Sequence, residues 1–295
     1  MRGAEASRWF IGSRVDRPRA RIYGFAHAGG SSAAFRSWVR VFPPDVEFLA
    51  IESPGHGRRL LEPPIPRLID LAASIERYML PDDDVPFAFV GISMGGVVAL
   101  EVALHMQASG RRLPEWLAVS GTAAPGTPRG QRPIGELEDG ALVEALRLRA
   151  DTPKAVLQNS ELMDLLLPGI RSDFQAVETY VPRSPRSLGL SIWATVGRQD
   201  ANIHPPDLDG WGAWTATFES SIHSGGHLFC YRDARFASEL KARVDAIARP
   251  RAQSARYGGS RRNECFGGTP VTEGRTRSVP QQVAASTCSA ASEES

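Results

Sequence analysis

Cysteine and long apolar runs are scarce in this sequence of 295 residues. Its three cysteines, Cys230, Cys265 and Cys288, are odd in number and form no C-x-x-C pair. This pattern argues against a disulfide framework and against a zinc site, so we expect a reducing, cytoplasmic environment and no metal. No stretch reaches the roughly 18 apolar residues of a spanning helix, and the N-terminus has no signal-peptide core. The sequence therefore predicts neither secretion nor a membrane anchor.

Net charge of one sign is nearly absent as well. The 34 Lys and Arg residues and 33 Asp and Glu residues leave a formal charge of +1. Without a basic field, the sequence does not predict binding to nucleic acid or to an anionic membrane surface. Hydrophobic residues make up 42% and charged residues 23%, which is ordinary for a folded soluble protein.

Short apolar runs alternate with helical patterns along the chain. Most runs are continuously apolar, as is typical of strands that are buried on both faces. Strand–helix–strand alternation predicts an α/β fold with a mostly parallel central sheet that is flanked by helices. The candidate strands are Ile22–His27, Val46–Ile51, Phe87–Ile92, Trp116–Ser120, Leu190–Val196 and Trp214–Ile222.

Composition divides the chain into three parts. Residues 1–20 are Arg-rich and weakly patterned, and we interpret them as a weakly ordered leader. Residues 21–249 form the predicted α/β domain. Within it, residues 123–187 show no strand pattern. Two or three helical segments are predicted there, at Glu136–Arg149, Pro153–Leu167 and Gly169–Tyr180, and we expect either a helical lid or an ordinary peripheral excursion. Residues 250–295 have few large apolar side chains, which predicts a disordered tail.

The pentapeptide at residues 91–95, Gly-Ile-Ser-Met-Gly, is a G-x-S-x-G motif. It follows a predicted strand and precedes a predicted helix, which is the context of a nucleophile elbow. In such an elbow the serine lies on a sharp turn, and glycines on either side leave room for the crowded backbone. The alternative is a Gly/Ser turn without chemistry. We interpret Ser93 as a candidate nucleophile.

A serine nucleophile needs a base, and in this architecture the histidine follows the serine and an acid in the chain. His227 lies in a Gly-rich loop just past the last predicted strand, and His223 and then His204 are the alternatives. The other three histidines do not fit this order: His27 and His56 precede Ser93, and His105 lies inside the helix that is predicted after it.

The acid is expected after the candidate strand Leu190–Val196. Asp200 lies in that loop and would orient the imidazole of the base. Asp207 and Asp209 follow in the same region and are the alternatives.

A Gly-rich turn follows the first candidate strand, in the sequence His-Ala-Gly-Gly-Ser-Ser from residue 27. Hydrolases with a nucleophile elbow take one oxyanion-hole N–H from such a turn and the other from the residue after the nucleophile. This nominates the backbone amides of Ala28 and Met94. The alternatives are an ordinary tight turn and a phosphate cradle, but no GKS, GKT or G-x-G-x-x-G motif supports nucleotide binding.

Several segments together resemble the type II thioesterases of polyketide and non-ribosomal peptide biosynthesis, which are α/β-hydrolases. The resemblance covers roughly Arg21 to Ala248. The segments are Phe25–Phe42 (FAHAGGSSAAFRSWVRVF), Val46–Arg59 (VEFLAIESPGHGRR), Phe87–Glu101, Leu167–Tyr180 (LPGIRSDFQAVETY) and Gly225–Phe229.

The resemblance implies an α/β-hydrolase with a helical lid that hydrolyses acyl thioesters on carrier-protein phosphopantetheine, clearing stalled acyl groups. It implies Ser93 as nucleophile, His227 as base and Asp200 as its orienting acid, without cofactor or metal. The implied partner is an acyl or peptidyl carrier protein, and we expect a monomer. The sequence departs from the family at Ile92, where a histidine is common, so we expect an altered contact near the elbow.

Two other functions use the same residues differently. A stand-alone esterase or an acyltransferase would keep the triad and change the acceptor, which product identity would reveal. A catalytically silent carrier-protein binder would keep only the fold, but the intact set of serine, aspartate and histidine argues against it.

Overall fold

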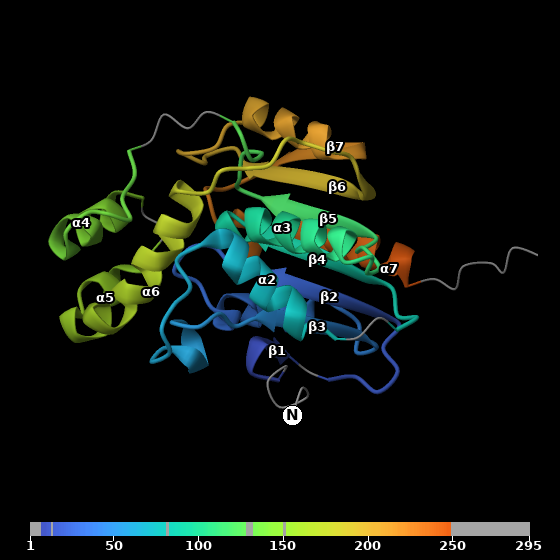
Figure 1. Ribbon diagram of the computed structural model, residues 1–295, viewed down its shortest axis with the longest axis horizontal. Coiled ribbons are helices and arrows are strands. Elements are labelled where there is room, and N and C mark those ends of the chain that lie inside the picture. The colour runs from blue at the N-terminus through green and yellow to red at the C-terminus, as the bar shows by residue number, and fades with distance from the viewer. Residues whose placement is uncertain (1–6, 13, 81–82, 128–131, 150–151, 249–295) are drawn as a thin grey trace, which may run out of the picture. The chain divides into compact units, whose positions relative to one another are not determined.

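A seven-stranded sheet with the order β1-β3-β2-β4-β5-β6-β7 forms the centre of the computed structural model (Figure 1). The structure describes residues 7–12, 14–80, 83–127, 132–149 and 152–248. Strand β1 pairs antiparallel with β3, and the other neighbouring strands pair in parallel. The strands are β1 (Phe10–Gly12), β2 (Ala20–Phe25), β3 (Val46–Ile51), β4 (Phe87–Ile92), β5 (Trp116–Ser120), β6 (Leu188–Gly197) and β7 (Thr215–His223).

Helices cover both faces of the sheet, so its central strands are buried on both sides. Strand β4 illustrates this, because Phe89 packs with α2 (Leu68–Tyr78) and α3 (Met94–Ala108), whereas Val90 packs into the opposite core. That second core is formed with the 3₁₀ segments η1 (Ser32–Arg40) and η4 (Phe229–Tyr231) and with α7 (Ala234–Ile247). The two remaining 3₁₀ segments are η2 (Gly57–Arg59) and η3 (Pro205–Trp214). The predicted α/β fold with a mostly parallel sheet is confirmed.

Three helices between β5 and β6 lie beyond one end of the sheet (Figure 1). They are α4 (Asp139–Arg149), α5 (Lys154–Leu157) and α6 (Ser160–Glu178). They share a small apolar core of their own, which includes Leu142 and Phe174. Residues 123–187 therefore contain helices and no strand in the part that the structure describes, as the sequence predicts.

Helix α6 is longer than the sequence pattern indicates. The pattern predicts one segment over 153–167 and another over 169–180, on either side of Pro168. An interior proline removes a helical hydrogen bond. The structure continues α6 through Pro168. Leu167 and Ile170 are both buried, and their packing on either side of the proline offsets the lost bond. A Cβ on Gly169 would lie 2.5 Å from the carbonyl oxygen of Gly55, so glycine here lets the helix approach that loop closely.

The N-terminal segment differs from the expected weakly ordered leader. Within residues 1–20, Phe10–Gly12 forms the edge strand β1, and Phe10 is paired with Ile51. Trp9 and Phe10 are each only 3% exposed. Burial of these two side chains stabilises the ordered segment, although the Arg-rich composition of residues 1–20 does not indicate it. The proposed tail at 250–295 lies outside the described residues.

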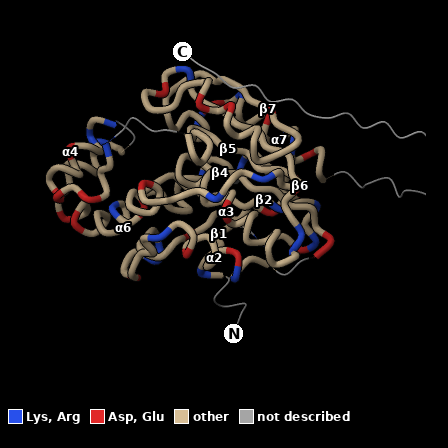
Figure 2. Tube along the Cα trace, turned by 45° about the horizontal axis from the view of Figure 1, so that its top comes forward, with Lys and Arg blue, Asp and Glu red and all other residues tan. Residues whose placement is uncertain are grey.

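Charged residues of both signs are interspersed along the trace in the view of Figure 2. None of the described helices combines the length and the apolarity that are needed to span a bilayer.

Candidate active site

Ser93 lies between β4 and α3 in a strained backbone conformation. Its φ is +52° and its ψ is −121°, which a residue with a side chain rarely adopts. The flanking glycines are required sterically, because a Cβ on Gly91 would overlap the backbone of Gly95 and Gly96. A Cβ on Gly95 would likewise overlap the carbonyl oxygens at the end of β2. The turn is therefore the sharp elbow that the motif predicts.

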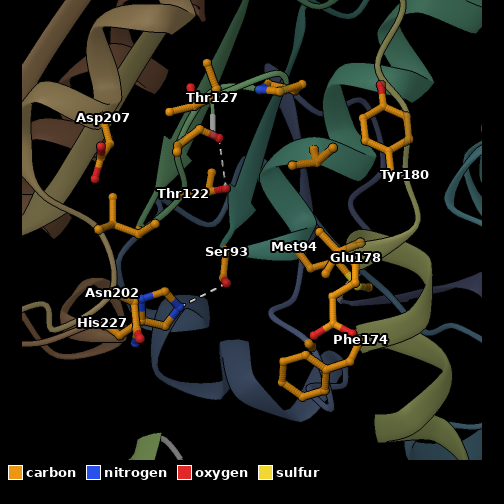
Figure 3. Close-up of a pocket in the computed structure, with 18 of the residues that line it drawn as sticks. Ser93, Met94, Thr122, Thr127, Phe174, Glu178, Tyr180, Asn202, Asp207 and His227 are labelled. Carbon is orange, nitrogen blue, oxygen red and sulfur yellow. Dashed lines mark hydrogen bonds between the residues drawn. The ribbon is translucent and has the colours of Figure 1, made fainter. Parts of the chain in front are cut away.

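Three side chains from separate loops form a continuous hydrogen-bonded chain. His227 Nε2 lies 2.9 Å from Ser93 Oγ, and His227 Nδ1 lies 2.9 Å from Asp200 Oδ2 (Figure 3 draws the first contact). A carboxylate only accepts hydrogen bonds, so Nδ1 carries the proton and Nε2 accepts from the serine hydroxyl. The structure brings together the three residues that the sequence nominates, although they lie up to 134 positions apart.

Asp200 is held as a buried carboxylate by three hydrogen bonds, two from its own loop and one from the histidine. Besides His227, it accepts hydrogen bonds at Oδ1 from the N–H groups of Asn202 (2.9 Å) and Ile203 (3.2 Å). Burial acts to raise the pKa of Asp200, but the hydrogen bond and charge of His227 and these two N–H groups outweigh it and lower the pKa. Asp200 is therefore suited to stabilise a positive imidazolium.

The alternative base and acids have other roles in the structure. His223 is buried at the end of β7, where its ring stacks on Phe229 and its Nε2 contacts Ser221 Oγ at 3.0 Å. Asp207 accepts a hydrogen bond from the N–H of His204 at the start of η3, and Asp209 is exposed. Of these, only His204 and Asp207 line the cavity described below.

The Gly-rich turn after β2 is closed by a hydrogen bond from Gly30 N–H to the carbonyl of His27 at 2.8 Å. Ala28 and Met94 both line the same cavity as Ser93. Met94 begins α3, and the first N–H groups of a helix have no partner inside it. The N–H of Ala28 makes no hydrogen bond to another residue in the described part of the chain. Within that part, two N–H donors are thus available at the serine.

His27 is a neighbour of the site, although its order in the chain excludes it as the base. Its Nδ1 lies 3.1 Å from the hydroxyl of Tyr231 in η4. Burial is the largest cause that lowers the pKa of His27 to about 4, and the nearby His227 adds to the shift. His27 is therefore neutral at pH 7 and adds no positive charge beside the base.

A cavity of about 580 Å³ opens at Ser93 and His227. Helix α6 and the chain that follows it contribute Phe174, Glu178 and Tyr180 to its lining, and Figure 3 shows these residues across the pocket from His227 and Asn202. Ile92 does not line this cavity, because it is buried in the core beneath η1 and α7. Ile92, where the resembled family commonly has a histidine, thus packs on the face of the sheet opposite α2 and α3.

Comparison with models of protein families identifies the family of this chain. The model of the Thioesterase domain family matches residues 20–245. The chain belongs to this family. The match contains the elbow, the Gly-rich turn and the loops of Asp200 and His227, and it ends within α7.

Individual relatives of this thioesterase include a protein named for peptide biosynthesis and a protein named as a thioesterase. It is 30% identical to the gramicidin S biosynthesis protein GrsT of Aneurinibacillus migulanus, over 77% of this chain and 90% of that protein. It is 32% identical to the thioesterase PikA5 of Streptomyces venezuelae, over 71% of this chain and 75% of that protein.

Two solved structures of similar fold are described as type II thioesterases. BorB, from the borrelidin biosynthetic cluster, is 29% identical with a TM-score of 0.71, covering 82% of this chain and 98% of that one. YbtT, from the yersiniabactin NRPS/PKS pathway, is 25% identical with a TM-score of 0.73, covering 82% of this chain and 100% of that one. The α/β-hydrolase fold and the thioesterase class are thereby confirmed.

Proposed function

We propose that this thioesterase hydrolyses acyl thioesters on the phosphopantetheine of carrier proteins, and that Ser93, His227 and Asp200 carry the reaction. The observation that supports the triad is the hydrogen-bonded chain from Asp200 through His227 to Ser93 at a cavity of about 580 Å³. GrsT is named for gramicidin S biosynthesis, BorB comes from the borrelidin biosynthetic cluster and YbtT from an NRPS/PKS pathway. These relatives support a carrier-bound substrate.

The first half of the reaction forms an acyl-enzyme. Ser93 Oγ attacks the thioester carbonyl carbon while His227 Nε2 takes the hydroxyl proton. The backbone N–H groups of Ala28 and Met94 stabilise the oxyanion of the tetrahedral intermediate. The carbon–sulfur bond then breaks, and the pantetheine sulfur takes the proton from His227. Asp200 stabilises the imidazolium between these two transfers.

The second half releases the acid. His227 takes a proton from a water molecule, whose oxygen attacks the Ser93 ester. The bond from the acyl carbon to Ser93 Oγ breaks, and His227 returns the proton to the serine. The products are the free acid, the unloaded carrier and the starting enzyme, so no oxidant, metal or cofactor is consumed.

The acceptor of the acyl group separates this function from its alternatives. The test incubates the full chain with a carrier protein loaded with a short acyl thioester and, separately, with a simple acyl ester. Release of free acid from the carrier supports the proposal. Cleavage of the ester alone would identify a stand-alone esterase, and formation of a new ester or amide would identify an acyltransferase.

Labelling with a fluorophosphonate probe tests the triad independently. We expect the wild type to be labelled at Ser93 and Ser93→Ala to remain unlabelled. A folded wild type that takes up no probe would favour a catalytically silent carrier-protein binder.

A further inference from the structure

The lid helix α6 makes a direct polar contact with the Gly-rich turn at the active site. The buried Asp173 accepts a hydrogen bond at Oδ2 from the N–H of Gly29, at 2.7 Å. Asp173 lies 144 positions from Gly29 in the chain. It neither lines the cavity nor belongs to the triad.

Apolar contacts bring the helix equally close to the turn. Gly29 has a φ of +75°, and a Cβ at this position would lie 2.9 Å from Ile170 Cγ1 of α6. Ile170 precedes Asp173 by about one helical turn, so both lie on the same face of α6. This face therefore contacts the turn by packing and by a hydrogen bond.

A buried histidine lies against the Asp173 carboxyl group. His56 Nε2 lies 2.9 Å from Asp173 Oδ2, and His56 Nδ1 lies 3.1 Å from the carbonyl of Pro54. Both ring nitrogens lie close to oxygen acceptors, an arrangement that favours the doubly protonated ring. Burial opposes this charge, but Asp173 and the carbonyl of Pro54 outweigh it and raise the pKa of His56.

Two adjacent peptide planes of the turn are fixed by different partners. The carbonyl of His27 accepts from Gly30, and the N–H of Ala28 belongs to the same peptide and points the opposite way. The next peptide carries the N–H of Gly29, which Asp173 holds. The oxyanion donor is thus oriented inside the turn, and the turn is anchored to the lid.

We propose that Asp173 is a positioning residue through which the lid helix holds the oxyanion turn in its productive geometry. The inference rests on the proposed function, in which the N–H of Ala28 stabilises the oxyanion. Docking of α6 then completes the oxyanion hole as well as covering the cavity. The contribution arises only when the oxyanion forms, so it acts on kcat rather than on KM.

The experiment compares two substitutions of similar shape. Asp173→Asn retains an oxygen that can accept from Gly29, whereas Asp173→Leu fills the space without an acceptor. Loss of a whole oxyanion donor costs about 10²–10³ in rate, and a displaced donor costs less. We expect Asp173→Leu to lower kcat by about 10- to 100-fold with little change in KM, and Asp173→Asn to restore most of it.

Binding of an alkylboronic acid supplies a readout that a merely structural role would not change. This inhibitor forms a tetrahedral adduct with the serine and needs the oxyanion donors, so Asp173→Leu should weaken it by the same factor as kcat. The matched control is Gln175→Leu, because Gln175 on the same helix does not line the cavity and donates from its side-chain amide to the carbonyl of Gly135. We expect this control to leave kcat, KM and boronate binding near those of the wild type.

The outcomes separate the two proposals. A wild type that does not unload the carrier contradicts the proposed function, whereas the boronate comparison still tests the turn. An Asp173→Leu variant with unchanged kcat and boronate affinity, or with only KM raised, overturns the positioning role. If Asp173→Leu does not fold, the double variant His56→Phe with Asp173→Leu replaces the buried ion pair by apolar groups, which is often tolerated.

Discussion

Asp200→Asn tests the triad most informatively, because the structure dictates how the new amide must lie. Oδ1 of Asp200 accepts from the N–H groups of Asn202 and Ile203, so the amide NH₂ cannot occupy that position without two unfavourable donor–donor contacts. The NH₂ must face His227 Nδ1 instead. It then donates to Nδ1, which moves the imidazole proton to Nε2, and Nε2 can no longer accept from Ser93.

The expected cost follows from the wrong tautomer. A triad with this change loses about 10⁴ in kcat, which corresponds to about 5.4 kcal/mol of transition-state stabilisation. The assay is single-turnover release of acid from an acyl-loaded carrier, with thermal unfolding to verify the fold. Asp209→Asn is the matched control, because this exposed aspartate lies in the same region. An Asp200→Asn rate within about tenfold of the wild type, or an equal loss in the control, would refute the reasoning.

Three further predictions concern stability and the alternative base. Gly95→Ala forces a Cβ onto backbone carbonyls, which should lower the free energy of unfolding by about 2 kcal/mol and Tm by roughly 4–8 °C. The control is Gly140→Ala, which should not lower Tm because its Cβ would meet no atom within 4 Å. His223→Asn should lower Tm through the lost stacking on Phe229, yet lose far less than the about 10²–10⁴ in rate expected for removal of a base; a loss of that size would make His223 the base. The folded-state pKa of Asp200 is lowered, so its contribution to the free energy of unfolding is complete above the unfolded pKa of about 3.9 and is lost as the pH falls through the folded pKa. The Tm of the wild type should therefore fall more steeply in acid than the Tm of Asp200→Asn. Parallel curves of Tm against pH would contradict this.

The sheet and the triad were accessible from the sequence because their signals are local. Buried parallel strands appear as continuous apolar runs, and Phe87–Ile92 and Trp116–Ser120 have the same bounds in sequence and structure. Asp200 and His227 follow the two strands after the helical segment of residues 123–187, so chain order was sufficient to nominate them.

The features that the sequence analysis missed depend on tertiary contacts. Trp9 and Phe10 are ordered by packing at the edge of β3, which the surrounding arginines conceal. Helix α6 continues through Pro168 because the residues on both sides are buried. Asp173 carries no local motif for its contact with Gly29, and its only signal was its place in the segment Leu167–Tyr180 that resembles the thioesterase lid.

Intact-mass spectrometry of an acyl-loaded carrier protein tests the central claim most directly. The carrier is incubated with the wild type and with Ser93→Ala at equal concentration. The account predicts that the wild type converts it to the unloaded phosphopantetheine form and free acid, while Ser93→Ala leaves it loaded. A carrier that stays loaded with both proteins would contradict the proposed substrate, and equal unloading by both would contradict Ser93 as the nucleophile.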